Sequence, residues 1–375
     1  MEIKKYVQKN KDEMYGILKD LCHIPAPSHM EQKRAEYCKN KLLEMGAEGV
    51  YIDDALNVVY PINCEGSSEI TVVVAHTDTV FPDLEPMPYS DDGKIIRCPG
   101  VGDGAASVAV LMISAKYLIE NNIKPENGLL IVLNSCEEGL GNLKGTRQIF
   151  KDYEGRIKQF VSYDGRIGSI ADRCVGSHRY EITVKTEGGH SFVAFGNKNA
   201  IAELSKIVTD IFKIEVPKFD NSKTTYNVGI ISGGTSVNTI CQEASMLCEY
   251  RSDNVECLGI MKEKFEKIFN DAKSDDVGVF VKLVGERPCA DGVDEEKIRE
   301  MGEIFEKDIK DVCGIEEIRH QSASTDCNIP MSLGVPAICT GVYTGGGTHT
   351  REEWIEKDSM ILGLELGIKH ILSII

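Results

Sequence analysis

Short apolar runs alternate with helical stretches along the first part of the chain. ITVVVA (70–75), GLLIVLNSC (128–136) and QFVSYD (159–164) each have the length and apolar content of a buried strand. Between the first two runs, AASVAVLMISAKYLIENN (105–122) is long enough and apolar enough to predict a helix that is buried on most sides. This alternation predicts an α/β domain whose mixed, mostly parallel sheet is flanked by helices.

The first 50 residues or so predict two helices before any strand. One helix covers the start of the chain to about Leu21. The second follows PAPSHMEQ, where Ser28 has the character of an N-cap residue with Glu31 three positions later. We therefore expect Ser28 to begin the second helix.

The pattern changes near Ser177 and returns to the first style after about Cys289. HRYEITVKTEGG alternates apolar and polar residues, as a half-exposed antiparallel strand does. A helix, two strands, a second helix and a strand follow, which is the β-α-β-β-α-β order of a ferredoxin-like α+β unit. We therefore expect residues 1–176 and 289–375 to form one domain, and residues 177–288 to form a second domain inserted into it.

Histidine or carboxylate residues follow four of the predicted strands of the first domain. They are His76 and Asp78, Glu137 and Glu138, Asp164 and, after VPAICTG and a glycine-rich stretch, His349. A further candidate, Asp103, lies where a loop meets the start of the apolar helix. Each residue alone has an ordinary structural explanation, such as an N-cap for an aspartate at a helix start. Because ligands bind outside the carboxyl ends of the strands in such sheets, we expect the whole set to meet in one site.

The residue types in this set predict a metal centre. Two histidines and three or more carboxylates suit Zn²⁺ or a similar divalent ion, and the excess of carboxylates favours two ions that share a bridging ligand. Asp78 lies on the same strand face as His76 and can hold the second nitrogen of its imidazole. Since adjacent residues point apart, one of Glu137 and Glu138 can bind metal while the other acts as a general base.

Composition limits the class of protein. The 375 residues are enough for two domains, and the net charge of −17 argues against a nucleic-acid partner or an anionic membrane surface. The thirteen cysteines include no CxxC pair, as expected for reduced thiols in a cytosolic protein. No run reaches the roughly 18 apolar residues of a membrane span, and the charged N-terminus does not resemble a signal peptide. We therefore expect a cytoplasmic protein with no membrane partner.

Several segments, in order along nearly the whole chain, resemble the M20 family of dinuclear zinc peptidases and, within it, the peptidase T-like group. They are HTDTVFP, GVGDGAAS, CEEGLGNLKGTR, SYDG, GSHRYEITVKTEGGHSFVAFG, NVGIISGGTSVNTI, STDCNIPMSLGVPA and GGGTHTREEWI.

The resemblance implies a role for each member of the predicted site. The implied roles are His76 and Asp164 on one metal, Glu138 and His349 on the other, Asp103 as the bridge, Asp78 as the residue that orients His76, and Glu137 as the general base. The peptide bond after the bridging aspartate is often cis in this family, and the sequence leaves the state of Asp103–Gly104 open.

The inserted unit matches the lid or dimerisation domain of the family. The resemblance implies that His190, in GGHSF, reaches the active site of a partner subunit and polarises the scissile carbonyl, so a homodimer through the lid is expected. Asn238 and Arg251 match positions that hold substrate, with the arginine on a carboxylate. GGHS could instead be an ordinary turn, and Arg251 could belong to a surface ion pair.

These observations together predict an exopeptidase, of the aminopeptidase kind, that cleaves amide bonds of small peptides with two divalent ions, most simply zinc, with cobalt or manganese as alternatives. A rival hypothesis is a deacylase of N-acyl amino acids, of the acetylornithine or succinyl-diaminopimelate type, with the same metals and bond chemistry. A third is a non-catalytic, metal-stabilised dimer.

Overall fold

An eight-stranded sheet forms the centre of the larger of two compact units. The computed structural model describes residues 2–219 and 221–375, and the larger unit comprises the residues up to Cys174 together with Asp291–Ile375. In spatial order, the strands are β1 (Tyr51–Ile52), β2 (Val58–Ile62), β6 (Gly128–Asn134), β3 (Ile70–His76), β7 (Ile157–Tyr163), β16 (Ala337–Thr340), β8 (Ser169–Cys174) and β15 (Arg319–Ala323). The central neighbours β6, β3, β7 and β16 run parallel, which confirms the predicted mixed, mostly parallel sheet.

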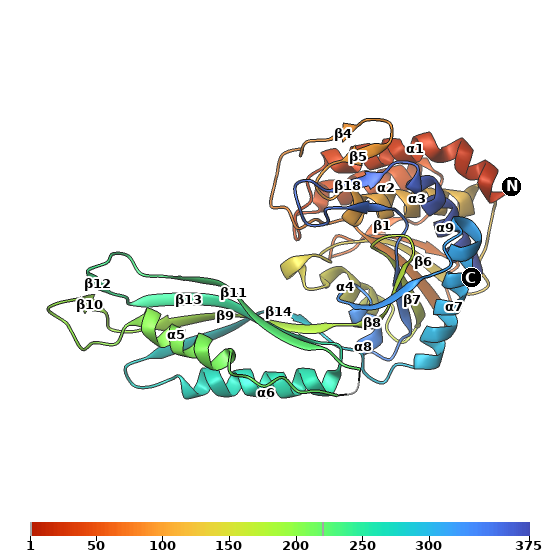
Figure 1. Ribbon diagram of the computed structural model, residues 1–375. Helices are drawn as coiled ribbons and strands as arrows, with labels where there is room; N and C mark the ends of the chain where they lie inside the picture. Colours follow the sequence, from red (N-terminus) through yellow and green to blue (C-terminus); the bar gives the residue numbers. More distant parts are fainter. Residues whose placement is uncertain (1, 220) are drawn as a thin grey trace. The chain divides into compact units, whose positions relative to one another are not determined.

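Helices cover the sheet because their apolar residues, like those of the strands, must leave water. The helix α3 (Ser107–Glu120) packs on β3, β6 and β7, and α9 (Ser359–Ser373) lies beside α3 and α7 (Glu295–Cys313). The helix α1 (Ile3–His23) packs on α3 and α9. The short helices α4 (Lys144–Asp152) and α8 (Asn328–Ser332) contact each other away from this layer, on the other side of the sheet in Figure 1.

The stretch Val101–Glu120, which includes α3, is long and apolar enough to span a membrane by length and composition alone. In the structure, however, 89% of its most apolar window is buried. It therefore packs as the central helix of the larger unit, as its apolar sequence predicts.

The parallel strands end at a common edge. His76, the last residue of β3, lies opposite Asn134, the last residue of β6, and Thr340 of β16 lies opposite Tyr163 of β7. Val74 of β3 in turn lies opposite Ser162 of β7. This register places the segments that follow β3, β6 and β7 side by side.

A small sheet of four short strands stands next to this edge in the larger unit. Its order is β17 (Gly345–Gly346), β18 (Trp354–Glu356), β5 (Ile95–Arg97) and β4 (Ser90–Asp91). The pairing of Trp354 with Arg97 brings the chain near residue 350 against the chain near residue 100. Sequence analysis did not predict these strands, because each has only two or three residues.

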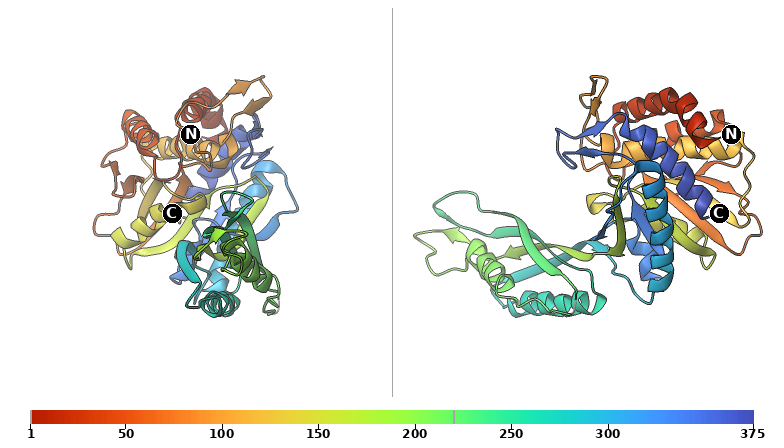
Figure 2. Two further views of the ribbon diagram at one scale, coloured as in Figure 1. Left: turned by 90° about the vertical axis from the view of Figure 1, so that its left-hand side faces the viewer. Right: turned by 45° about the vertical axis from the view of Figure 1, so that its right-hand side comes forward.

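The smaller unit comprises Val175–Ala290, slightly more than the predicted 177–288. Its antiparallel sheet has the order β11 (Thr224–Gly233), β13 (Glu243–Ser252), β9 (Gly176–Lys185) and β14 (Gly278–Arg287). The helices α5 (Ala200–Ile211) and α6 (Val255–Asp271) cover one face of this sheet (Figure 2). A short pair, β10 (Gly189–His190) and β12 (Thr239–Ile240), extends from it.

The expected N-cap role of Ser28 is wrong. The helix α2 spans Gln32–Glu44 and has Glu31 at its N-cap position, with no side-chain capping hydrogen bond. The Ser28 hydroxyl instead donates to the carboxylate of Asp78 at 2.6 Å. The helix begins four residues after Ser28, and the hydroxyl donates to a charged acceptor that the tertiary fold brings close, which makes a strong hydrogen bond.

Candidate metal centre

The structure brings together all seven residues predicted for the metal site. His76 ends β3, Asp78 follows it, and Asp164 follows β7 directly. The remaining residues lie in loops of the same unit: Glu137 and Glu138 after β6, His349 between β17 and β18, and Asp103 in the turn Val101–Ala106. The strand register therefore explains the first group, and the turn and the small sheet bring in Asp103 and His349.

The carboxylate of Asp103 lies between the two histidines. One of its oxygens, Oδ1, is 2.9 Å from His76 Nε2, and the other, Oδ2, is 2.9 Å from His349 Nε2. His349 Nε2 also lies 3.1 Å from Oε1 of Glu138. Two groups of potential ligand atoms share Asp103, each with all its atoms within 4.8 Å: His76, Asp103 and Asp164, and Asp103, Glu138 and His349. A third group within the same limit consists of His76, Glu137 and Glu138.

Burial and these contacts shift the pKa values of the histidines and carboxylates in the site. Hydrogen bonds to Asp103 and Glu138 raise the pKa of His349 to about 11. Burial lowers the pKa of His76, but its hydrogen bonds to Asp103 and other acceptors outweigh burial and hold the pKa well above its usual value. Burial raises the pKa of Glu138 to about 7, and burial together with the charge of Asp103 raises the pKa of Asp164 well above its usual range.

The donors fit two divalent cations. Histidine nitrogen and carboxylate oxygen are the ligands that Zn²⁺ takes in catalytic sites. A carboxylate whose two oxygens face two different groups of ligands, as those of Asp103 do, suits a ligand shared by paired ions. Burial is the main cause that raises the pKa of Glu138 and of Asp164, and the neighbouring carboxylates add to it, whereas the same carboxylates raise the pKa of His349 by accepting its hydrogen bonds. Several carboxylates gathered at one buried place favour bound positive charge. Two cations would supply that charge.

Asp78 holds the turn that carries Glu137 and Glu138. Its Oδ1 accepts a hydrogen bond from the backbone N–H of Glu137 and its Oδ2 from that of Glu138, each at 2.9 Å. Nδ1 of His76, the nitrogen that faces away from Asp103, lies 3.2 Å from the backbone carbonyl oxygen of Asp78 and 3.5 Å from its Oδ1. Asp78 can therefore orient the imidazole, and it also fixes the position of both glutamates.

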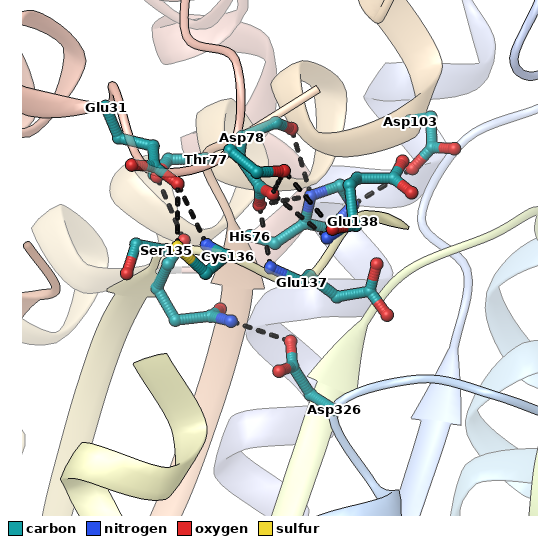
Figure 3. A network of polar contacts seen from close by, with 12 residues as sticks. Glu31, His76, Thr77, Asp78, Asp103, Ser135, Cys136, Glu137, Glu138 and Asp326 are labelled. Atoms are coloured by element: carbon teal, nitrogen blue, oxygen red, sulfur yellow. Dashed lines mark hydrogen bonds and ion pairs between the residues drawn. The ribbon is translucent and has the colours of Figure 1, made fainter. Parts of the chain in front are cut away.

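A second buried carboxylate supports the same turn from the other side. The backbone N–H of Cys136 donates to Oε1 of Glu31 at 3.0 Å. Cys136 has φ of 58°, a left-handed conformation that is uncommon for a residue with a side chain. Figure 3 shows Glu31 on one side of this turn and the carboxylates of Glu137 and Glu138 on the other side, toward Asp103.

The loop of Asp103 contains two glycines in left-handed conformations, Gly100 and Gly104, with φ of 76° and 92°. The peptide bond between Asp103 and Gly104 is trans, which answers the question that the sequence left open. A side chain at Gly104 would come within 3.1 Å of the ring of His76, so glycine lets the loop approach the histidine.

Three further buried carboxylates, for which the sequence predicted no role in the site, surround the centre: Glu31, Glu353 and Asp326. Oxygens of Glu353 accept hydrogen bonds from three backbone N–H groups of the Asp103 loop. Asp326 accepts from Asn134 Nδ2 at 2.7 Å, and burial and the charge of Glu137 raise its pKa to about 7. The only signal in the sequence was the position of Glu353, four residues after His349.

The three residues predicted to contact substrate lie in the smaller unit. His190 is exposed on β10, and the backbone of Ser191, beside it, donates to the carbonyl oxygen of Asn238 at 2.9 Å. The guanidinium of Arg251 binds the carboxylate of Glu249 through Nε at 2.8 Å and Nη2 at 3.0 Å. His190 and Asn238 are thus neighbours, whereas Arg251 forms the ion pair that the simpler interpretation anticipated. Their roles toward substrate stay predictions.

Comparisons with known proteins agree with this geometry. Residues 57–201 match the sequence model of peptidase family M28, and residues 175–277 match that of the M20 peptidase dimerisation domain. The aminopeptidase PepT of Bacillus cereus is 21% identical with a TM-score of 0.72, and the alignment covers 97% of this chain and 98% of that one. A Staphylococcus aureus tripeptidase is 19% identical with a TM-score of 0.73, and the alignment covers 97% of this chain and 99% of the tripeptidase. A succinyl-diaminopimelate desuccinylase of Corynebacterium glutamicum is 23% identical over 341 residues, 89% of each chain.

Proposed function

Since the chain belongs to the M20/M28 family of zinc peptidases and is a metallo-hydrolase, we propose that it is an exopeptidase that cleaves small peptides with two zinc ions. The observation that carries this proposal is the position of Asp103, whose two oxygens face the ligand groups of two separate sites. The family uses a dinuclear metal site, and the cluster of buried histidine and carboxylate groups provides the donors for it.

Each candidate ligand is assigned to one or both of the two ions. His76 and Asp164 would hold one ion, Glu138 and His349 the other, and Asp103 both. When bound, paired divalent cations polarise an amide carbonyl and make water acidic near neutral pH.

Glu137 is the general base of the proposed reaction. It takes a proton from the water whose oxygen attacks the amide carbonyl carbon, and it returns that proton to the amine nitrogen as the carbon–nitrogen bond breaks. Its backbone is fixed by Asp78, and its carboxylate extends to the side of the turn where Glu138 and Asp103 lie (Figure 3). A carboxylate oxygen of Glu137 lies within 4.8 Å of potential ligand atoms of His76 and Glu138, so this side chain can reach a water at the centre.

The smaller unit contributes to the proposal through a homodimer. His190 is followed by Phe192, Val193 and Phe195, which are 82–91% exposed. Contiguous exposed apolar side chains of this size are typical of surfaces that another chain or a ligand covers. We assign His190 to the active site of a second subunit, where its imidazole donates a hydrogen bond to the scissile carbonyl oxygen.

A cytoplasmic location is part of the same proposal. All thirteen cysteines lie in the described residues and are free thiols. A reducing compartment maintains this state.

A deacylase of N-acyl amino acids is the second candidate function. The desuccinylase of C. glutamicum aligns with 89% of this chain, so the same fold and metal ligands could serve an acyl substrate. The preference for a peptidase over a deacylase rests on the sequence stretches GSHRYEIT and GGGTHTREEW, which resemble the peptidase T-like group.

A substrate panel with metal analysis tests the proposal. The purified chain is loaded with Zn²⁺, Co²⁺ or Mn²⁺ and assayed on dipeptides, tripeptides, acetyl-amino acids and succinyl-amino acids. We expect two ions per chain and hydrolysis of peptides at the greatest kcat/KM. Preference for an acyl-amino acid would select the deacylase, and fewer than two ions with no hydrolysis would reject a dinuclear hydrolase.

A further inference from the structure

Glu353 is a buried carboxylate with an unusual set of partners. It lies directly before β18 and is only 2% exposed. Its Oε2 accepts a hydrogen bond from the N–H of Gly100 at 2.7 Å, and its Oε1 accepts from the N–H groups of Gly102 and Asp103 at 2.9 and 2.8 Å. The backbone of Glu353 also accepts from the N–H of Cys98 at 3.2 Å. One residue therefore receives four backbone hydrogen bonds from the loop that carries Asp103.

This loop is a distorted π-helical turn with few backbone hydrogen bonds of its own, such as Val101 N–H to Cys98 O at 3.0 Å and Ala105 N–H to Gly100 O at 3.4 Å. Gly100 and Gly104 are left-handed, and Asp103 itself departs from helical geometry with φ of −76° and ψ of 100°. Its N–H groups would otherwise be buried without partners, which costs about 1–3 kcal/mol for each group. The two oxygens of Glu353 satisfy three of them at once, so the direction of Asp103 depends on this side chain.

Glu353 also lies on the segment that carries a second metal ligand. His349 is four residues earlier, in the connection from β17 to β18, and has φ of 64°. The pairing of β18 with β5 holds this connection beside the Asp103 loop. Glu353 thus joins the loop of the shared ligand to the loop of a ligand that belongs to one site alone.

We propose that Glu353 is a positioning residue for the dinuclear centre, which holds the bridging carboxylate of Asp103 in the orientation that serves both ions. This inference rests on the proposed function, since it concerns how the same two ions are bound. A positioning role predicts a change in the affinity for both ions, whereas a purely structural role predicts a change in stability alone. Because Asp103 is common to both sites, a change at Glu353 weakens both ions together, whereas loss of His349 weakens one.

Glu353→Gln is the direct test. Glutamine has the same shape but offers one acceptor oxygen, so its NH₂ group must face at least one backbone N–H of the loop. Replacing a residue that orients a metal ligand typically costs 10–100-fold in affinity. We expect both zinc dissociation constants to rise by about 10–100-fold, measured by equilibrium dialysis against graded free Zn²⁺ with elemental analysis of the protein.

The chain offers a matched control at the neighbouring position. Glu352 is exposed, so Glu352→Gln makes the same chemical replacement without touching the loop. We expect this variant to bind both ions as the unchanged protein does. His349→Ala provides the contrasting case, with one ion weakened far more than the other.

Thermal unfolding of the metal-free proteins separates positioning from folding. A purely structural role lowers the melting temperature of Glu353→Gln while the folded protein keeps both affinities within twofold, and that result would overturn the inference. Weakening of one ion only would also overturn it. If Glu353→Gln does not fold, Glu353→Asp keeps the charge but withdraws the oxygens, and the same joint loss of affinity is expected. If the unchanged protein binds fewer than two ions, the proposed function fails first and the inference with it.

Discussion

Replacing Asp78 with asparagine keeps the shape of the side chain but removes one of its two acceptor oxygens. In the structure these oxygens accept hydrogen bonds from the N–H groups of Glu137 and Glu138, each at 2.9 Å, and the side chain is completely buried. The amide of asparagine can accept from one of these groups, and its NH₂ then faces the other. One buried N–H loses its partner, which costs about 1–3 kcal/mol of unfolding free energy.

The same substitution acts on the metal centre through His76. Nδ1 of His76 lies 3.2 Å from the backbone carbonyl oxygen of Asp78, which the substitution keeps, and 3.5 Å from Oδ1 of the carboxylate, which it replaces. Removal of a carboxylate that orients a ligand typically lowers metal affinity or activity by about 10–100-fold. Asp78→Asn should therefore lower both the stability of the metal-free protein and kcat/KM, by about 1–3 kcal/mol and 10–100-fold.

Urea unfolding of the metal-free proteins and kcat/KM on the best peptide measure the two effects. The exposed residue Asp54 is the control, since Asp54→Asn removes the same charge at the surface. Ser28 donates to Oδ2 of Asp78 at 2.6 Å, so the double change with Ser28→Ala should show a coupling energy of about 0.5–3 kcal/mol. The reasoning is refuted if Asp78→Asn unfolds within about 0.5 kcal/mol of the unchanged protein and keeps kcat/KM within twofold.

Three further predictions concern catalysis, assembly and pH. Glu137→Gln should lower kcat by about 10²–10⁴ while elemental analysis still finds two ions, and near-normal kcat with both ions bound would remove Glu137 as the base. Mixed dimers of a His190→Ala chain and a Glu137→Gln chain should recover part of the activity that each lacks, and no recovery after proven subunit exchange would contradict a role in trans. Burial lowers the pKa of His370, stacked on Phe305, to about 3. The unfolded chain therefore binds a proton that the folded chain does not between about pH 6.5 and 3, and this contribution to stability falls by about 1.4 kcal/mol per pH unit as pH is lowered. His370→Phe should reduce the loss of stability in acid, and equal acid unfolding curves for the two proteins would count against this pKa.

The local pattern of the sequence was sufficient to predict the long apolar strands of the larger unit and where they end. The apolar run before His76 is β3, the run before Glu137 is β6, and the change of pattern near Ser177 marks β9 and the smaller unit. These features depend on the sequence alone because a buried parallel strand must be apolar along its length, and because its carboxyl end must face the edge where loops form. The candidate ligands could therefore be predicted from their places after strands.

The supporting residues could not be predicted in this way. Ser28 had the local signature of a helix cap, but it donates to Asp78, fifty residues away. Glu353 is 250 residues from Asp103, and Glu31 is 105 residues from Cys136. A carboxylate that accepts backbone N–H groups from a distant loop has no periodicity and no fixed spacing, because any residue that the fold brings near can serve as its partner.

The sequence by itself determined the set of candidate metal ligands and placed most of them after apolar strands. Only the tertiary structure decided how they are held, because the orientation of Asp103 and of the Glu137–Glu138 turn depends on buried carboxylates that satisfy otherwise unpaired N–H groups. Such groups are costly to bury alone, so the fold recruits an acceptor from wherever the chain passes.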